Sequence, residues 1–255
     1  MVANEKDRMP LLGHLQELRK RLLISIISIC VGGIACWFLY DWILELLLEP
    51  CCQIRGASGS DSIFGLGCDL LVTDPLEPFS VRLTIAGYGG LILSVPMLLW
   101  QAWRFIAPGL LAKEKKWAIP FVLSGLLLFI AGAVLAYWSI PRALDFLVDI
   151  GGPDLVSVFS PSKYIGFVIK MIVAFGIGFE FPLLLIFLQL LGVLTPSALR
   201  RSRRYAIVGV VALVAVLTPS GDPFTLIILS VPMILFYEIA ILVGSLRNRK
   251  MRTEA

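Results

Sequence analysis

The sequence predicts an all-α integral membrane protein in which residues 1–255 form a single domain with six transmembrane helices. Two observations predict this class. Of the 255 residues, 58% are hydrophobic and 16% are charged, and the mean hydropathy is +0.89, whereas soluble domains are about half apolar and about a quarter charged. Apolar runs of about 20 residues, long enough to cross a bilayer, also recur along the chain. The composition excludes a nucleic-acid-binding domain, a disordered protein and a typical soluble enzyme.

The six apolar runs differ in length. The first begins directly after Arg19-Lys20-Arg21, covers residues 22–40 and can extend to residue 48; the others cover 83–103, 117–140, 164–194, 205–217 and 224–244. The fifth run forms a helix of only about 20 Å, about 10 Å less than the thickness of the hydrocarbon core. A tight turn connects it to the sixth run. We therefore expect a concave bundle with short helices five and six.

The lysines and arginines predict the orientation of these helices. If the N-terminus lies inside, 17 of the 22 cationic residues fall on inner segments, and such an excess marks the cytoplasmic side. We therefore expect a multi-pass protein of the cell (inner) membrane with both termini in the cytoplasm. Residues 1–21 form an amphipathic lead-in and residues 245–255 a tail.

The motifs of enzymes and metal sites are missing from the sequence. It contains no HExxH, GxSxG, P-loop or CxxC pattern. His14 is the single histidine, which argues against histidine-based catalysis and His-rich metal sites. We expect no enzymatic activity, no cofactor and no metal.

Three cysteines lie in the predicted outer loop, which is the oxidising side of a bacterial inner membrane. They are Cys51, Cys52 and Cys68. Three cysteines cannot all pair within one loop. Either Cys68 forms a disulfide with Cys51 or Cys52, or the thiols are free or pair alternately.

Two acidic residues stand among cations on the predicted inner side. Glu17 shares a helix face with Arg21 in the lead-in, so it forms either an interfacial ion pair with this arginine or a binding group for a ligand. Glu114 is the only acid beside Lys113, Lys115 and Lys116. Its alternatives are a solvated ion pair of small value and a binding group.

Glu180 lies inside an otherwise apolar run. A charge near mid-membrane costs roughly 2.5–3.5 kcal/mol on insertion scales, so this side chain should face a cavity or a polar partner. Lys170 is ten residues away, about 15 Å along a helix, and cannot be its direct partner. Glu238 lies nearer the inner interface. Asp222 occupies a tight outer turn, where the alternatives are a functional role and turn formation through an Asx hydrogen bond.

Taken in order, these segments resemble the TatC family, the multi-spanning receptor subunit of the twin-arginine protein translocase. The matching segments are His14 to Arg21, Glu49-Pro50, Thr73 to Phe79, Trp103 to Glu114, Phe175 to Pro182, and Leu217 to Pro219 with Asp222. The chain departs from the family pattern where Ser220-Gly221 adds spacing before Asp222, and in the cysteine-containing outer loop.

The resemblance implies a site for twin-arginine signal peptides on the cytoplasmic face. Its residues would be Glu17, Arg19, Phe105, Pro108 and Glu114, with the two carboxylates near the arginine pair. A carboxylate accepts the planar fork of a guanidinium bidentately, which a lysine cannot reproduce.

The resemblance also implies the partners of the chain. These are the signal peptides of folded cargo proteins, TatA/TatB-like single-span proteins, the lipid bilayer and further copies of the chain within the complex, without nucleic acid. Glu180 would contact a partner helix within the membrane. The alternative function is a proton- or ion-coupled secondary transporter that uses Glu180 and Lys170 as a relay.

Overall fold

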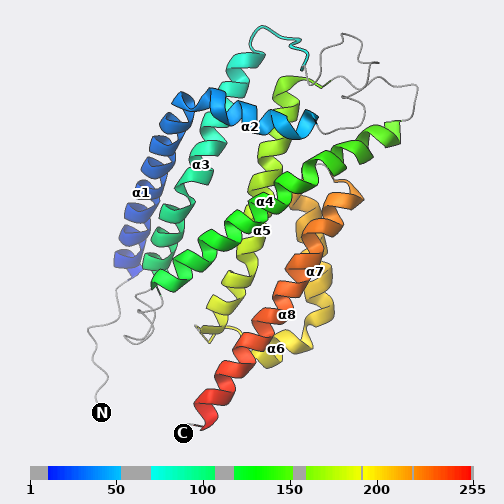
Figure 1. Cartoon of the computed structure of the whole chain (residues 1–255). Coiled ribbons are helices and arrows are strands. Elements are labelled where there is room, and N and C mark those ends of the chain that lie inside the picture. Colours follow the sequence, from blue (N-terminus) through cyan, green and yellow to red (C-terminus); the bar gives the residue numbers. More distant parts are fainter. Residues whose placement is uncertain are drawn as a thin grey trace.

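The computed structural model describes residues 11–52, 70–106, 118–151, 159–190, 192–219 and 221–253, and these residues form helices without any strand (Figure 1). The helices are α1 (Leu11–Phe38), α2 (Tyr40–Cys52), α3 (Glu77–Ile106), α4 (Ala118–Gly151), α5 (Pro161–Leu190), α6 (Pro196–Arg201), α7 (Arg203–Leu217) and α8 (Pro223–Thr253). The predicted all-α class is confirmed.

Five of these helices are long and apolar enough to cross a membrane. Their spanning parts are Leu15–Phe38, Glu77–Phe105, Ile119–Ile150, Pro161–Gln189 and Pro223–Leu246. Helix α7, with 15 residues, is the predicted short fifth crossing. Helix α8 has 31 residues and is longer than the prediction, because its last turns continue into the cationic tail.

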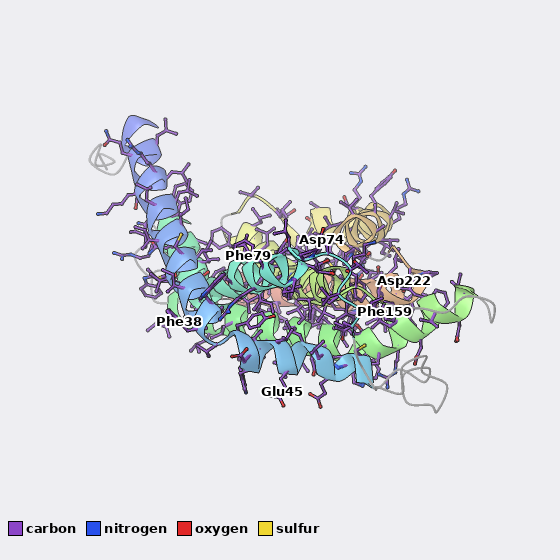
Figure 2. The ribbon with its side chains drawn as sticks, turned by 90° about the horizontal axis from the view of Figure 1, so that it is seen from above. Phe38, Glu45, Asp74, Phe79, Phe159 and Asp222 are labelled. Atoms are coloured by element: carbon purple, nitrogen blue, oxygen red, sulfur yellow. The ribbon has the colours of Figure 1, made fainter. Side chains whose placement is uncertain are left out.

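The chain bends at Leu39, so the first apolar run does not continue as one helix to residue 48. Helix α2 instead lies across the bundle (Figure 1), and Figure 2 shows its Glu45 pointing away from the other helices. Pro50 inside α2 has no N–H to bond the Leu46 carbonyl. The Tyr137 hydroxyl of α4 donates to this carbonyl at 2.9 Å, so a neighbouring helix satisfies the group that the proline leaves free.

The bundle has two ends, which we name by the helices that reach them. Helix α1 begins and α3, α5 and α8 end at one end, the terminal end, and α2 lies at the other, the α2 end (Figure 1). At the α2 end, the buried Glu77 carboxylate accepts hydrogen bonds from Thr73 N at 3.1 Å, Ser162 N at 3.0 Å and Ser162 Oγ at 2.8 Å, and from Ser160 Oγ. It thereby joins the start of α3 to the start of α5.

Helix α5 is the centre of the bundle, because it packs against α3, α4 and α8. Within its apolar 18-residue window 56% of the residues are buried, against 11% within that of α1. Met171 and Phe175 of α5 are fully buried beside Leu229 and Met233 of α8. Contacts with these three neighbouring helices therefore fix the position of α5 in the bundle.

Helix α1 is held to the bundle by close packing of its backbone against α3. A Cβ on Gly90 would lie only 2.5 Å from Gly33 N and 2.7 Å from Ile29 O. Lipid tails are as apolar as the helix surface, so transmembrane helices associate through such close contacts between small residues.

We expect Gly90→Ala to weaken the docking of α1, because the added methyl group would force the two backbones apart. Overpacking of this kind typically costs about 1–3 kcal/mol. The measurement is thermal stability of the detergent-purified chain. The matched control is Gly87→Ala on the same helix, where an added Cβ meets no atom within 4 Å. Equal melting temperatures for the two variants would contradict the packing argument.

Candidate functional site

Glu17 and Arg21 form the predicted ion pair on the first turns of α1. The Arg21 Nε donates to Glu17 Oε1 at 3.2 Å, and the Nη2 donates to the same oxygen. Arg21 also reaches across to α3, where its Nη1 donates to Gln101 Oε1 at 3.3 Å. The guanidinium therefore connects α1 to α3 at the terminal end.

The second oxygen of this carboxylate remains unused. Glu17 Oε2 is shielded from solvent and accepts no hydrogen bond from the described residues, and the side chain as a whole is 20% exposed. A shielded carboxylate oxygen without a donor carries a desolvation cost. A donor that reached this oxygen would remove that cost.

The last turns of α3 are held rigidly below this carboxylate. Trp103 is buried, and its ring packs at a tilt of 40° against Phe121 of α4 with centroids 4.7 Å apart and meets Phe187 of α5 edge-on at 6.3 Å. Gln101 is buried two residues before it. Phe105 follows on the same helix and is half-buried.

The structure brings together only some of the predicted peptide-binding residues. Glu17 and Arg21 meet Gln101, and Arg19 is exposed on the same helix. Pro108 and Glu114 lie outside the described residues, so the expected second carboxylate stays a prediction. The sequence analysis did not identify Gln101 as a site residue. The feature that could have identified it is a polar side chain near the end of an apolar run, four positions before Phe105.

Glu180 is the second polar feature of interest and lies on α5. Its Oε1 is buried and has no hydrogen-bond partner among the described residues. A Cβ on Gly125 of α4 would lie 3.1 Å from Glu180 Oε2 and 2.9 Å from Leu99 Cδ1 of α3. The absence of a side chain at Gly125 leaves the room that this carboxylate occupies.

The other predicted ionisable residues have different surroundings. Lys170 is exposed and forms no hydrogen bond or ion pair with Glu180, so the two side chains do not form a direct relay. Glu238 accepts a hydrogen bond from Arg203 Nη2 at 2.7 Å, with the two side chains 44% and 49% exposed. Such an exposed pair contributes little stability.

Asp222 caps α8, which agrees with the turn-forming alternative. Its Oδ1 accepts from Thr225 N at 2.8 Å and its Oδ2 from Thr225 Oγ1 at 2.6 Å. The carboxylate satisfies a backbone donor that the first turn of a helix leaves free. Gly221, with φ of 59°, makes the turn before it, in a conformation that favours glycine.

The cysteine and metal predictions are tested only in part. Cys51 is buried without a disulfide, while Cys68 and the side chain of Cys52 lie outside the described residues. Within the described part of the chain, no three His, Cys, Asp or Glu side chains gather in a group that could hold a metal ion.

Comparison with known proteins places this arrangement in one family. The family model "Sec-independent protein translocase protein (TatC)" matches residues 13–232. The TatC proteins of Frankia casuarinae and Aquifex aeolicus are each 38% identical to the chain, over 97% and 96% of its length and 68% and 98% of their own. A crystal structure of the twin-arginine translocase receptor TatC superposes with a TM-score of 0.75 at 37% identity, covering 91% of this chain and 98% of that one.

The family model covers the chain from the first turn of α1 into α8. They indicate a core subunit of the twin-arginine translocase, a multi-pass inner-membrane protein that transports proteins and is not an enzyme. The chain belongs to the TatC family of Sec-independent protein translocase proteins.

Proposed function

We propose that this chain is the receptor of the translocase and binds twin-arginine signal peptides at the terminal end of α1 and α3. The observation that carries the proposal is the Glu17 carboxylate, which has one oxygen held by Arg21 and the other shielded and without a donor. A guanidinium of the peptide can donate to the free oxygen, in a charge-assisted hydrogen bond stronger than a neutral one.

Recognition of an arginine pair needs a second acceptor. Glu114, which the family resemblance assigns to the same site, would supply it, with Phe105, Arg19 and Pro108 beside the peptide. Two carboxylates that each take one guanidinium would require two arginines, because lysine cannot donate as a planar fork. The surrounding cations act as topology anchors.

The terminal end is the cytoplasmic side in this proposal. The support is the distribution of cations, because 17 of the 22 lysines and arginines fall on the segments that the sequence predicts to lie inside. The peptide site would then face the compartment in which cargo proteins fold.

Glu180 serves the assembly of the translocase. A buried acid without a partner in a membrane helix is costly unless something donates to it. We infer that a polar residue on the helix of a TatA/TatB-like single-span protein donates to Glu180 Oε1. The short α7 would thin the surrounding bilayer, and further copies of the chain would complete the complex.

Replacing Glu17 with Gln should weaken signal-peptide binding at least about tenfold. The variant keeps the shape of the side chain but loses a charge-assisted contact of about 1.5–3 kcal/mol, less where water competes. The measurement is crosslinking of a labelled twin-arginine peptide to membranes that contain the chain. Glu238→Gln, which alters an exposed acid on α8, is the matched control, and Glu114→Gln should behave like Glu17→Gln. Unchanged crosslinking in both site variants would refute the receptor site.

The orientation can be tested by labelling introduced cysteines in intact cells. Positions 115, 203 and the tail beyond 247 should be protected, and positions 58, 154 and 220 should be labelled, because the cation-rich segments stay inside. A labelled tail would contradict the count of six membrane crossings. The short α7 would then be the helix whose crossing is most open to revision.

Glu180→Ala should leave peptide binding intact but impair export of a folded reporter, because it removes the acceptor for a partner helix. Glu180→Gln should retain part of the export, since its amide oxygen still accepts a hydrogen bond. Leu127→Ala, at a lipid-exposed position of α4, controls for a general loss of side-chain volume. If the Glu180→Ala variant exports the reporter at the wild-type rate, the proposed contact of Glu180 with a partner helix is wrong, and Glu180 is only a tolerated structural residue.

A further inference from the structure

The carboxylate that the proposed function assigns to a peptide arginine already holds an arginine of its own chain. Arg21, one turn after Glu17 on α1, donates to Glu17 Oε1 through Nε at 3.2 Å and through Nη2. The Arg21 and Glu17 side chains are only 16% and 20% exposed, so water competes little for this pair. A guanidinium of the peptide would make the same kind of contact. Arg21 therefore occupies the group that the peptide needs.

This internal pair does not use the whole carboxylate. Both Arg21 donors converge on Oε1, and the shielded Glu17 Oε2 has no donor among the described residues. The strongest contact between a guanidinium and a carboxylate is bidentate, with two parallel N–H···O bonds to two oxygens. A peptide guanidinium that took both oxygens in this way would have to displace Arg21 from Oε1. If Arg21 stayed, two like charges would share one carboxylate and repel each other.

Gln101 of α3 provides a second acceptor for Arg21. The Nη1 of Arg21 donates to Gln101 Oε1 at 3.3 Å. Gln101 is only 5% exposed, and its Nε2 contacts the Met97 sulfur at 3.9 Å, so the amide is held in place on a helix that the buried Trp103 ring fixes against its neighbours. A guanidinium carries five N–H donors. Its contact with Gln101 can therefore persist while Nε and Nη2 release Glu17.

We propose that Arg21 is a built-in competitor of the signal peptide: it occupies Glu17 in the empty receptor and is left with Gln101 alone when a peptide guanidinium takes both carboxylate oxygens. This inference rests on the proposed function and adds the residue that sets the affinity of the site. The competitor keeps the enclosed carboxylate paired while no peptide is bound, since an unpaired charge is costly there. It also returns to Glu17 as the peptide leaves, which keeps binding reversible.

Two other roles of Arg21 lead to different results. If the ion pair only supports the helix, its loss changes stability slightly and leaves peptide affinity unchanged, because pairs one turn apart contribute little. If Arg21 instead positions Glu17 for the peptide, replacing the arginine weakens peptide binding. Only a competitor gives tighter peptide binding when it is replaced.

The test measures the dissociation constant of a labelled twin-arginine peptide for the full chain in membranes, from the concentration dependence of crosslinking. Arg21→Lys keeps the charge but loses the planar fork of donors, so this variant should bind the peptide about three- to tenfold more tightly. Arg21→Gln should bind it at least as tightly as Arg21→Lys. Lys20→Gln is the matched control, because Lys20 is exposed and forms no ion pair with Glu17; removing this charge should change the affinity little.

A double-mutant cycle tests the role of Gln101. Gln101→Leu should weaken peptide binding in the chain that keeps Arg21, because the displaced guanidinium loses its second acceptor and holds Glu17 more firmly. The same change should have little effect in the Arg21→Gln background, where nothing is displaced. Such non-additivity is the signature of two residues that act through one contact. Equal effects in the two backgrounds would overturn the exchange between Glu17 and Gln101.

The outcomes separate this inference from the proposed function. If Glu17→Gln loses peptide binding while Arg21→Lys and Arg21→Gln bind the peptide as the unchanged chain does, or more weakly, the competitor is overturned and the receptor site stands. If Glu17→Gln binds the peptide like the unchanged chain, both fail. All affinities are measured below the lowest melting temperature of the variants, so that a loss of stability does not appear as a loss of binding.

Discussion

A polar group inside a hydrocarbon layer is costly unless another group satisfies it, and most of this structure follows from that constraint. Glu77 is buried at the α2 end and takes four hydrogen bonds from its own segment and the start of α5. The carbonyl that Pro50 leaves free receives the Tyr137 hydroxyl. At the terminal end, Gln189 of α5 donates to the Ala240 carbonyl of α8 at 3.0 Å. These hydrogen bonds from polar side chains therefore fix how neighbouring helices pack together, which apolar contacts alone do not specify.

Against this background, the groups that remain unsatisfied are informative. Five buried polar side-chain atoms of the described residues lack a partner: Glu17 Oε2, Arg82 Nε, Glu180 Oε1, Gln189 Oε1 and Ser230 Oγ. Arg82 and Gln189 each place another atom in a hydrogen bond. Glu17 likewise has its other oxygen in the ion pair with Arg21, whereas Glu180 forms no hydrogen bond or ion pair with any described residue. A buried polar atom without a partner carries a desolvation cost, and an added donor would remove that cost at either carboxyl group.

Hydropathy sufficed to find the crossings, since about 20 apolar residues have few alternatives to a membrane helix. It could not separate α1 from α2, because a bend at Leu39 does not interrupt the apolar run. Glu17 and Glu180 were also predictable, as an acid among cations and an acid among apolar residues. Gln101 and Gly125 were not. Their roles depend on neighbours about 80 and 55 positions away in the sequence, and the local hydropathy and spacing of a single sequence do not show which distant positions meet.

The proposed peptide site and the proposed partner contact at Glu180 are both bordered by the last turns of α3, so they are not structurally independent. Gln101 of α3 accepts a hydrogen bond from Arg21 beside Glu17, and Leu99, two positions earlier on the same helix, lies beside Gly125 where Glu180 faces α4. The Trp103 ring packs in a mutual cluster with Phe121 and Phe187 and fixes these turns of α3 against α4 and α5. Packed interiors transmit displacement because they contain few voids. Under the proposed function, a peptide guanidinium that altered the contact of Arg21 with Gln101 would act on the last turns of α3, which also border Glu180, and would thereby couple the proposed peptide site to the proposed partner contact.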